Sequence, residues 1–289
     1  MTTRPESVAV YGPGLMGASL LMALRVRCPL VKLGAWARRG DALEELRRRK
    51  LVDFASTDPA EVAAAADVVV LCLPVDKMSG VASQLVVALK AGAVVTDVGS
   101  VKQSVVRELE ECFKSQANFV GSHPMCGSED AGLPAARADL YDGAVCVITP
   151  TACSRPEMMN AVRHLWELVG ARVLVMDPVQ HDRAAALVSH VPHVAAAMLV
   201  ELVAAETPEV RAMCAGGFRD TTRVASGPAD LWTAILSLNR TEVARGLGRA
   251  AEKLQAVQAA LEQNNMDAVK AFLESAVRHR SEISGGTRS

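Results

Sequence analysis

Aromatic residues are scarce in this chain of 289 residues, and neither sign of charge prevails. Five Phe, two Tyr and three Trp do not provide a platform on which the bases of a single nucleic-acid strand would stack. With 31 Lys and Arg against 32 Asp and Glu, the formal net charge is -1, so there is no bulk positive field to hold phosphates. We therefore expect no nucleic-acid partner.

Long hydrophobic runs and paired cysteines are also missing. His, Pro or Glu interrupts the apolar stretches, of which 194–200 is typical, so we expect no 18-residue span that could cross a bilayer. The N-terminal residues lead directly into an apolar stretch and lack the h-region of a signal peptide. The seven Cys are irregularly spaced without a CxxC pair, which indicates reduced thiols. The sequence predicts a cytoplasmic protein with no membrane partner.

Short β-branched runs alternate with helical periodicities over residues 1–176. Strands are expected at 8–11, 33–37, 67–73, 93–98, 118–121, 144–148 and 172–176, and helices at 15–27, 42–50, 77–89, 101–112 and 157–169. The run 68–73 is continuously apolar, as in a strand that helices cover on both faces. This alternation predicts an α/β fold with a Rossmann-type, doubly wound parallel sheet.

The strand pattern ends near residue 176, and helical periodicity follows. Asp177 is expected to cap a helix that begins with Pro178, and apolar residues recur at helical spacing from 184 to 202. Further helices are expected at 229–238, 242–263 and 266–280. We therefore expect a dinucleotide-binding domain at 1–176 and an all-α substrate and dimerisation domain at 177–289. Alone, this small Ala-rich half would expose much apolar helix surface, which predicts a homodimer.

A GxGxxG motif lies between the first expected strand and the first expected helix. Gly12 permits the tight turn, Gly14 lets the backbone approach a pyrophosphate, and Gly17 allows close packing of helix and strand. Leu15 and Met16 lie at the helix N-terminus, whose free N–H groups favour an anion. In this context the motif predicts a nicotinamide dinucleotide site. The alternative is a glycine turn without a ligand.

The choice between NAD and NADP depends on the end of the second strand. An acidic residue about 20 positions after the glycines would bind the ribose 2′-hydroxyl of NAD. Here Ala37 is followed by Arg38 and Arg39, and no acid occurs until Asp41. Two guanidinium groups suit the 2′-phosphate of NADP, so we expect NADP, with use of NAD left open. The alternative is that both arginines are simply solvated.

Two further segments follow strands and are expected at the ligand-binding edge of the sheet. Leu73, Pro74 and Val75 end an apolar strand and are expected to face the nicotinamide ribose. Ser100 and Gln103 form an S-x-x-Q capping-box pattern, which favours helix capping by Ser100. Such a cap can also face a ligand.

The next two polar segments contain histidines. His123 follows the strand expected at 118–121, and histidine is the natural acid-base residue near neutral pH, so a catalytic and a structural role both stay open. His190 and His193 form an HxxH pair with no third ligand at suggestive spacing, so we expect no metal. Pro192 removes a backbone hydrogen bond to Val188 and is expected to kink the helix. The histidines around it are either structural or a substrate-facing patch.

A glycine turn at 216–217 is followed by Arg219 and Arg223. Arginines grouped in this way can bind a carboxylate in bidentate fashion, although a solvated charged turn is equally compatible with the spacing.

Five segments together resemble the prephenate and arogenate dehydrogenases of tyrosine biosynthesis: GPGLMG, DVGSVK, GSHPMCGSE, HDRAAALVSHVPH and GFRDTTRVASGPADLW. They occur in the family's order, from about residue 7 to 240. The resemblance implies a nucleotide-binding α/β domain and a helical dimerisation domain, in a short form without a chorismate mutase or ACT-type domain. It implies NAD(P)-dependent oxidative decarboxylation of prephenate to 4-hydroxyphenylpyruvate, or of arogenate to tyrosine.

The resemblance also implies roles for single residues. His123 is the catalytic base that accepts the proton of the ring 4-hydroxyl, and Ser100 helps to orient that histidine or the nicotinamide. His193 contacts the substrate, and Arg223 binds its ring carboxylate. The positions that line or gate the substrate site are Ser128, Glu129 and Trp232.

Two questions of function stay open. Gln180 is neutral where the ammonium of arogenate would favour an acid, so we expect prephenate as the substrate. Another two-domain reductase would share the GxGxxG half but not GSHPMCGSE followed by SHVPH. A nonenzymatic NADP(H) sensor is the more distant alternative, and His123 together with Arg223 argues against it.

Overall fold

The structure, a computed structural model, describes residues 5–114, 119–127 and 130–285. Its internal contacts divide the chain into two compact units, residues 1–240 and 241–289. The domain boundary predicted between residues 176 and 177 rests on the end of the strand pattern, and it stays a prediction.

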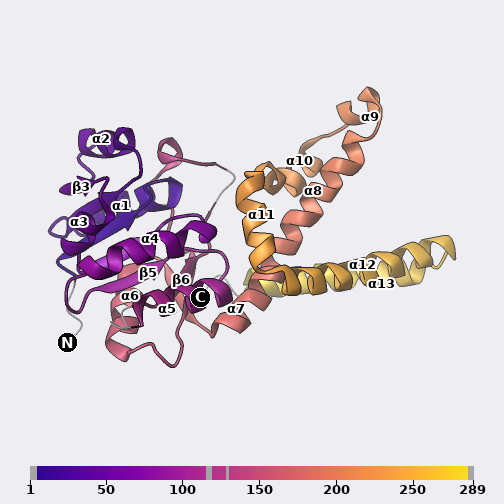
Figure 1. The fold of residues 1–289 in the computed structure, drawn as a ribbon. Coiled ribbons are helices and arrows are strands. Elements are labelled where there is room, and N and C mark those ends of the chain that lie inside the picture. The colour runs from indigo at the N-terminus through magenta and orange to yellow at the C-terminus, as the bar shows by residue number, and fades with distance from the viewer. Residues whose placement is uncertain (1–4, 115–118, 128–129, 286–289) are drawn as a thin grey trace. The chain divides into compact units, whose positions relative to one another are not determined.

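A five-stranded parallel sheet forms the first part of unit 1, in the order β3-β2-β1-β4-β5 (Figure 1). Its strands are β1 (Ser7–Tyr11), β2 (Lys32–Trp36), β3 (Phe54–Ser56), β4 (Val68–Leu71) and β5 (Val94–Asp97). The helices between and after them are α1 (Leu15–Arg27), α2 (Gly40–Arg48), α3 (Pro59–Ala64), α4 (Met78–Leu85) and α5 (Gln103–Phe113), with the short 3-10 helices η1 (Val75–Lys77) and η2 (Val86–Ala88) flanking α4. The strand order reverses between β1 and β4, the point at which open α/β sheets bind ligands. The expected Rossmann-type fold is confirmed.

A three-stranded sheet of order β6-β7-β8 continues the chain. It contains β6 (Gly121–Pro124), β7 (Val145–Thr149) and β8 (Arg172–Val175), with η3 (Leu133–Ala135) and α6 (Pro156–Leu168) between them. Strand β6 is antiparallel to β7, and β7 is parallel to β8. A parallel bridge between Val95 and Phe119 links this region to β5. The prediction that His123 follows its strand in a loop is wrong, because His123 lies inside β6, paired with Val147.

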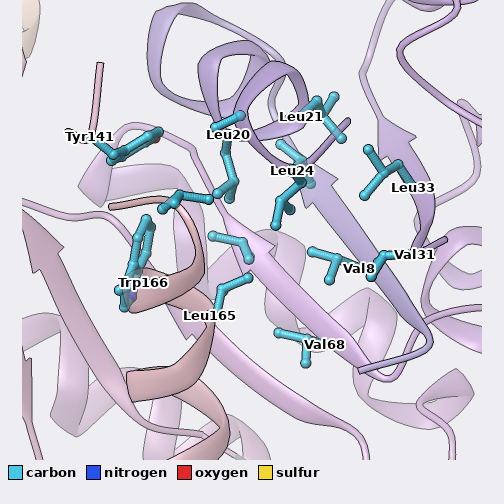
Figure 2. Packing of buried hydrophobic residues seen from close by; sticks show 14 of the residues in the cluster. Val8, Leu20, Leu21, Leu24, Val31, Leu33, Val68, Tyr141, Leu165 and Trp166 are labelled. Atoms are coloured by element: carbon cyan, nitrogen blue, oxygen red, sulfur yellow. The ribbon is translucent and has the colours of Figure 1, made fainter. Parts of the chain in front are cut away.

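A hydrophobic core packs α1 and α6 against the sheet (Figure 2). Leu20, Leu21 and Leu24 of α1 are fully buried in one cluster with Val8 of β1 and Val68 of β4. Burying one such side chain stabilises the fold by about 1.5–3 kcal/mol.

Trp166 of α6 belongs to the same cluster and carries a polar group into it. Its ring lies 5.4 Å from that of Tyr141, measured between centroids, and its indole Nε1 donates a 3.0 Å hydrogen bond to Ser122 Oγ of β6. The core therefore fixes the residue that directly precedes His123.

A long helical stretch follows β8 and combines α7 (Pro178–Ala185), the π-helical segment η4 (Ala186–His190) and α8 (Val191–Ala204). The Asp177 carboxylate accepts the backbone N–H groups of Val179 and Gln180, both at 2.9 Å, which confirms the predicted cap. The disruption expected at Pro192 takes the form of η4, in which Val191 N–H donates to Ala186 O five residues earlier. Unit 1 continues through α9 (Pro208–Ala212), α10 (Gly216–Thr222), η5 (Arg223–Ser226) and α11 (Ala229–Leu238).

Among the described residues, one helix, Pro178–Ala204, is long and apolar enough to cross a membrane by length and composition. The expectation that no such span exists is therefore wrong, because the polar residues that interrupt this stretch do not lower its mean hydropathy enough. A single helix of this kind is weak evidence for a membrane segment. The absence of a membrane partner stays a prediction.

Unit 2 consists of α12 (Arg240–Glu262) and α13 (Met266–Gly285), whose start sites lie within two residues of the predicted ones. Asn264, between them, adopts the left-handed region with φ 54°, as is common where a helix ends. Several large apolar side chains of this unit are exposed: Leu254, Leu261, Met266, Phe272, Leu273, Val277 and Ile283.

Candidate active site

The glycine loop joins β1 to α1 and is shaped by close backbone approaches. Gly12 has φ +92°, and a Cβ there would lie 2.5 Å from the carbonyl oxygen of Cys72. A Cβ at Gly17 would lie 2.6 Å from Val10 Cγ1. By contrast, a Cβ at Gly14 would meet nothing within 4 Å, so open space lies over this residue. Gly12 and Gly17 are required by the fold, and the open space over Gly14 is where a ligand can approach the backbone.

The N-terminus of α1 faces that space as an anion site. Gly14 is the N-cap without a side-chain cap, and the first turn has no acidic residue. The first helical bond of the backbone runs from Ala18 N to Gly14 O at 2.9 Å, so the N–H groups of Leu15 and Met16 have no acceptor within the helix. Donors that point out of a helix N-terminus suit a phosphate. This end of α1 fits a dinucleotide pyrophosphate.

The segment after β4 lies beside the glycine loop. The Cβ position of Gly12 is 2.8 Å from Leu73 Cδ2, and the Cβ position of Gly99 is 3.0 Å from Val75 Cγ1. Val75 is buried, whereas Pro74 is exposed. Residues 73–75 therefore connect the glycine loop to the segment that follows β5.

Arg38 and Arg39 follow β2 at the same edge of the sheet, because Gly12 N donates to Trp36 O at 3.0 Å. Both arginines are exposed. Arg39 Nε lies 3.5 Å from Asp41 Oδ1, an exposed pair of the kind that contributes about 0–1 kcal/mol. Arg38 makes no ion pair within the described part of the chain. Both guanidinium groups are therefore available near the glycine loop.

A fully buried ion pair between Lys102 and Asp97 lies under β6. Lys102 Nζ also donates to Ser122 O at 2.9 Å, and the Asp97 carboxylate accepts Gly99 N at 2.8 Å and Ser122 N at 3.1 Å. The pair thus binds both backbone polar groups of Ser122, next to His123. Both residues belong to the DVGSVK motif, whose sequence alone predicted no role for them.

His123 is buried, with 7% of its surface exposed, and is the first member of a chain of three side chains. Its Nδ1 lies 2.8 Å from His181 Nε2, and His181 Nδ1 lies 2.8 Å from Asp182 Oδ1. Sequence reasoning missed both partners, since they are 58 and 59 positions away in the chain. The one indication was that they belong to the HDRAAALVSHVPH segment.

Asp182 also caps α5. Its Oδ1 accepts Lys102 N at 2.7 Å, and its Oδ2 accepts Gln103 N at 2.9 Å. The helix begins at Gln103 with Lys102 as N-cap and no side-chain cap of its own. The capping box predicted for Ser100 is therefore wrong, because a carboxylate from α7 takes that place. Ser100 is half-buried in the bend before α5, which leaves its hydroxyl outside the cap.

His190 and His193 lie further along the same helical stretch, next to Trp232 of α11. The ring of His193 stacks on Trp232 with centroids 3.5 Å apart, and His190 meets Trp232 edge-on at 6.1 Å. Asn239 Nδ2 donates to Asp182 O at 2.8 Å and lies 3.1 Å from His190 Nδ1. His190 Nε2 and His193 Nδ1 are buried without a hydrogen-bond partner. Unpaired buried atoms of this kind mark a position for a polar ligand or water.

Burial keeps these histidines neutral. Desolvation lowers the pKa of His123 well below its usual value, and the charges of His181, Lys102 and His190 lower it further. Desolvation also lowers the pKa of His181, although Asp182 opposes this shift. The pKa of His190 is lowered to about 4, and burial is again the largest cause. A neutral His123 can accept a proton at neutral pH.

Three predicted site residues remain: Arg223, Ser128 and Glu129. Arg223 begins η5 and is exposed in the single chain. Ser128 and Glu129 lie outside the described residues. No group of three His, Cys, Asp or Glu that could hold a metal occurs among the residues described, and the expected absence of a metal stays a prediction.

Comparison with known proteins agrees with this arrangement. A family model for the nucleotide-binding domain of prephenate dehydrogenase matches residues 21–175, and one for its dimerization domain matches residues 177–275. Cyclohexadienyl dehydrogenase of Zymomonas mobilis is 34% identical over 239 residues, which are 81% of this chain and 81% of that protein.

Two solved structures are similar over nearly the whole chain. Prephenate dehydrogenase from A. aeolicus, in complex with hydroxyphenyl propionate and NAD+, has a TM-score of 0.91 at 28% identity, over 98% of this chain and 100% of that one. Arogenate dehydrogenase from Synechocystis has a TM-score of 0.82 at 28% identity, over 96% and 99%. With both domain models matched, the chain belongs to the prephenate dehydrogenase family of NAD(P)-dependent oxidoreductases.

Proposed function

We propose that this protein oxidises and decarboxylates prephenate to 4-hydroxyphenylpyruvate, with NADP as the preferred cofactor. The observation that carries the proposal is a buried, neutral His123 whose Nδ1 is bound by His181 and whose Nε2 makes no hydrogen bond within the described residues. A neutral imidazole whose second ring nitrogen has a lone pair can accept one proton.

His123 acts as the base in this proposal. A nicotinamide bound at the glycine loop would supply the acceptor for the hydride of C4 of the substrate ring. His123 Nε2 removes the proton of the 4-hydroxyl group, and aromatisation drives the loss of CO₂ from C1. The proton then returns from His123 to the phenolate oxygen, so that the product keeps its 4-hydroxyl group. Because the ring product is so stable, the residues mainly have to orient the substrate and remove that proton.

The substrate is proposed to be oriented by three residues, His193, Trp232 and Arg223. The stacked rings of His193 and Trp232 form one wall, and His193 Nδ1 is a buried polar atom that lacks a partner. Arg223 binds the ring carboxylate, with Ser128 and Glu129 proposed to line the same site. Ser100 is proposed to orient His123 or the nicotinamide. Its hydroxyl is available for this role because Asp182 caps α5 in its place.

Prephenate is favoured over arogenate because, among the described residues near these histidines, we find no acid placed to bind an ammonium group. Gln180 is neutral and exposed in the first turn of α7. Asp182 is close in sequence, but its two oxygens already accept three N–H groups. An ammonium group would need an unoccupied carboxylate, whereas the side-chain keto group of prephenate does not.

The preference for NADP and the homodimer rest on two further observations. Arg38 and Arg39 are exposed at the end of β2 and suit a 2′-phosphate. In the helical stretch after Asp177, four polar residues are buried (His181, Asp182, His190 and His193), whereas Val188 is 63% and Leu202 is 60% exposed in the single chain. A second copy that covers this apolar face accounts for its composition. A cytoplasmic location is part of the same proposal.

The test is nicotinamide reduction by the purified protein, with NADP⁺ and NAD⁺ each paired with prephenate and with arogenate. We expect the fastest turnover with NADP⁺ and prephenate. The His123→Asn variant is the matched control, and it should lose about 10²- to 10⁴-fold in kcat while its affinity for the cofactor stays near normal. Cofactor binding without turnover in all four pairs would instead support a sensor or another reductase. Full turnover by His123→Asn would remove His123 as the base.

A further inference from the structure

We propose that His181 and Asp182 are positioning residues that hold His123 in the tautomer with its proton on Nδ1 and its lone pair on Nε2. This inference rests on the proposed role of His123 as the base. It assigns roles to two residues for which the sequence motifs predicted none.

The direction of the chain of hydrogen bonds is set at Asp182. Its Oδ1 accepts Lys102 N and its Oδ2 accepts Gln103 N, so both oxygens act as acceptors at the N-terminus of α5. A carboxylate that caps a helix in this way is stabilised in its charged form by the exposed N–H groups and the helix dipole. His181 Nδ1, 2.8 Å from Oδ1, must therefore carry the proton and donate it.

The tautomer of His181 then dictates that of His123. A neutral imidazole has one N–H and one lone pair, so His181 Nε2 is an acceptor. His123 Nδ1 lies 2.8 Å from that atom and must be the donor. The lone pair of His123 is left on Nε2, which is the atom that has to receive the substrate proton. In the opposite tautomer Nε2 would carry a proton already and could not act as a base.

The surroundings of His123 preserve this arrangement. The charged and titratable groups around it are His181 and Asp182 from α7, Lys102 and Asp97 near α5 and β5, His190 from η4, and Cys146 of β7. The positive charge of Lys102 is paired with Asp97, and Asp182 is the acid that lies at the far end of the histidine pair. When His123 Nε2 takes the hydroxyl proton, one O–H bond breaks and one N–H bond forms. Its Nδ1–H still donates toward His181, with the Asp182 carboxylate beyond it.

The first test uses the unmodified protein and needs no substrate. Long-range ¹H–¹⁵N spectra of protein labelled in its histidine rings report which nitrogen carries the proton, and a His123→Asn sample identifies the His123 signals. At pH 7 we expect His123 as the Nδ1–H tautomer, with a protonated Nδ1 on His181 as well. An Nε2–H tautomer at His123 overturns the proposal, whatever the enzyme's substrate proves to be.

The second test compares two substitutions of His181. In His181→Gln the amide oxygen can take the place of Nε2 and still accept from His123, whereas His181→Phe keeps a ring of similar shape without an acceptor. We expect His181→Phe to lose about 10²-fold or more in kcat with little change in KM, as when a base is left in the wrong tautomer. His181→Gln should recover most of that loss. Equal losses in the two variants would contradict the proposal.

A double substitution separates positioning from a structural effect. In a His123→Asn background, His181→Phe should cause no further loss of kcat, because the residue acts only through His123. A further loss of the same size as in the wild-type background would show that His181 acts elsewhere. The affinity of each variant for NADP⁺, measured by titration, verifies that the nucleotide-binding half is folded. If the unmodified enzyme is inactive with all four substrate pairs, the proposed function fails while the tautomer measurement still decides this inference.

Discussion

Removal of the Asp182 carboxylate should destabilise the protein more than removal of a similar cap a few residues away. Asp182→Ala leaves two backbone N–H groups at α5 without an acceptor and also leaves the His181 Nδ1–H unpaired. The loss of an N-cap costs about 0.5–2 kcal/mol. A buried donor left unsatisfied costs about 1–3 kcal/mol more. The sum is about 3 kcal/mol of unfolding free energy.

Asp177→Ala is the matched control. Asp177 also accepts two backbone N–H groups at a helix N-terminus, both at 2.9 Å, but it is exposed and caps its own helix. Water can replace the lost carboxylate there, so we expect a loss of about 1 kcal/mol. At about 2–4 °C per kcal/mol for a chain near this size, Asp182→Ala should lower Tm by about 6–12 °C and Asp177→Ala by a few degrees.

Thermal and urea unfolding followed by circular dichroism measure the two losses. Hydrogen exchange provides the local readout, because the amides of Lys102 and Gln103 should exchange faster in Asp182→Ala than in Asp177→Ala. Equal losses of stability in the two variants would refute the reasoning, since burial and the link to His181 would then contribute nothing. Unchanged exchange at Lys102 and Gln103 would refute the assignment of Asp182 as the cap of α5.

Three further predictions concern the cofactor, pH and assembly. Replacement of Arg38 and Arg39 by Asp and Ala should shift the ratio of kcat/KM values from NADP⁺ toward NAD⁺; an unchanged ratio would mean that both arginines are merely solvated. Burial lowers the pKa of His190 from its usual 6.5 to about 4, so the unfolded chain binds more protons between these values and stability falls as pH falls through this window. His190→Asn, which keeps an acceptor for Asn239, should reduce this acid-induced loss of unfolding free energy by on the order of 3 kcal/mol in chemical unfolding. An unaltered loss would assign the acid sensitivity to other groups. Phe272→Glu with Leu273→Glu places charge on exposed apolar positions of α13, so light scattering should detect monomers, and a dimer as tight as the wild type would exclude this face from the interface.

The elements that depend on local sequence were predicted well. The glycine loop, the first strand and the Asp177 cap each involve residues within a few positions of one another, so their patterns are complete in the sequence. Strand β3 and helix α3 were missed because they are only 3 and 6 residues long, which is too short for a period to be recognised.

The candidate site was predicted only in part because its contacts are long-range. The bond between His123 and His181 crosses 58 positions, and that between Lys102 N and Asp182 crosses 80. A cap supplied from 80 positions away leaves no periodic trace at Ser100 or Gln103, so the local capping-box pattern was misleading there. The resemblance to the family suggested His123 and an orienting role for Ser100, but it did not suggest His181 and Asp182.

The helical stretch after Asp177 also reverses a common assumption about amphipathic helices. Its apolar periodicity suggested a helix with a buried apolar face and a few polar residues. In the single chain the buried side chains include His181, Asp182, His190 and His193, whereas Leu187 and Val188 are exposed. A sequence pattern specifies which residues share a face, but not whether that face meets a substrate, the rest of the chain or a second copy.

The π-helical segment η4 sets the rotational phase of the active-site helix. A π turn accommodates one extra residue, so it rotates everything after it by about 100° relative to an uninterrupted α-helix. Asp182 and His190 are eight positions apart, about 80° around an α-helix, and the extra residue brings them to within about 20° of each other. Asn239 can therefore bind Asp182 O and His190 Nδ1 with one amide nitrogen. The length of the chain between Asp182 and His190 is consequently as much a part of the site as its side chains. An uninterrupted α-helix over the same residues would turn His190 and His193 away from Asp182, whereas losing the extra residue together with the π turn would restore the phase.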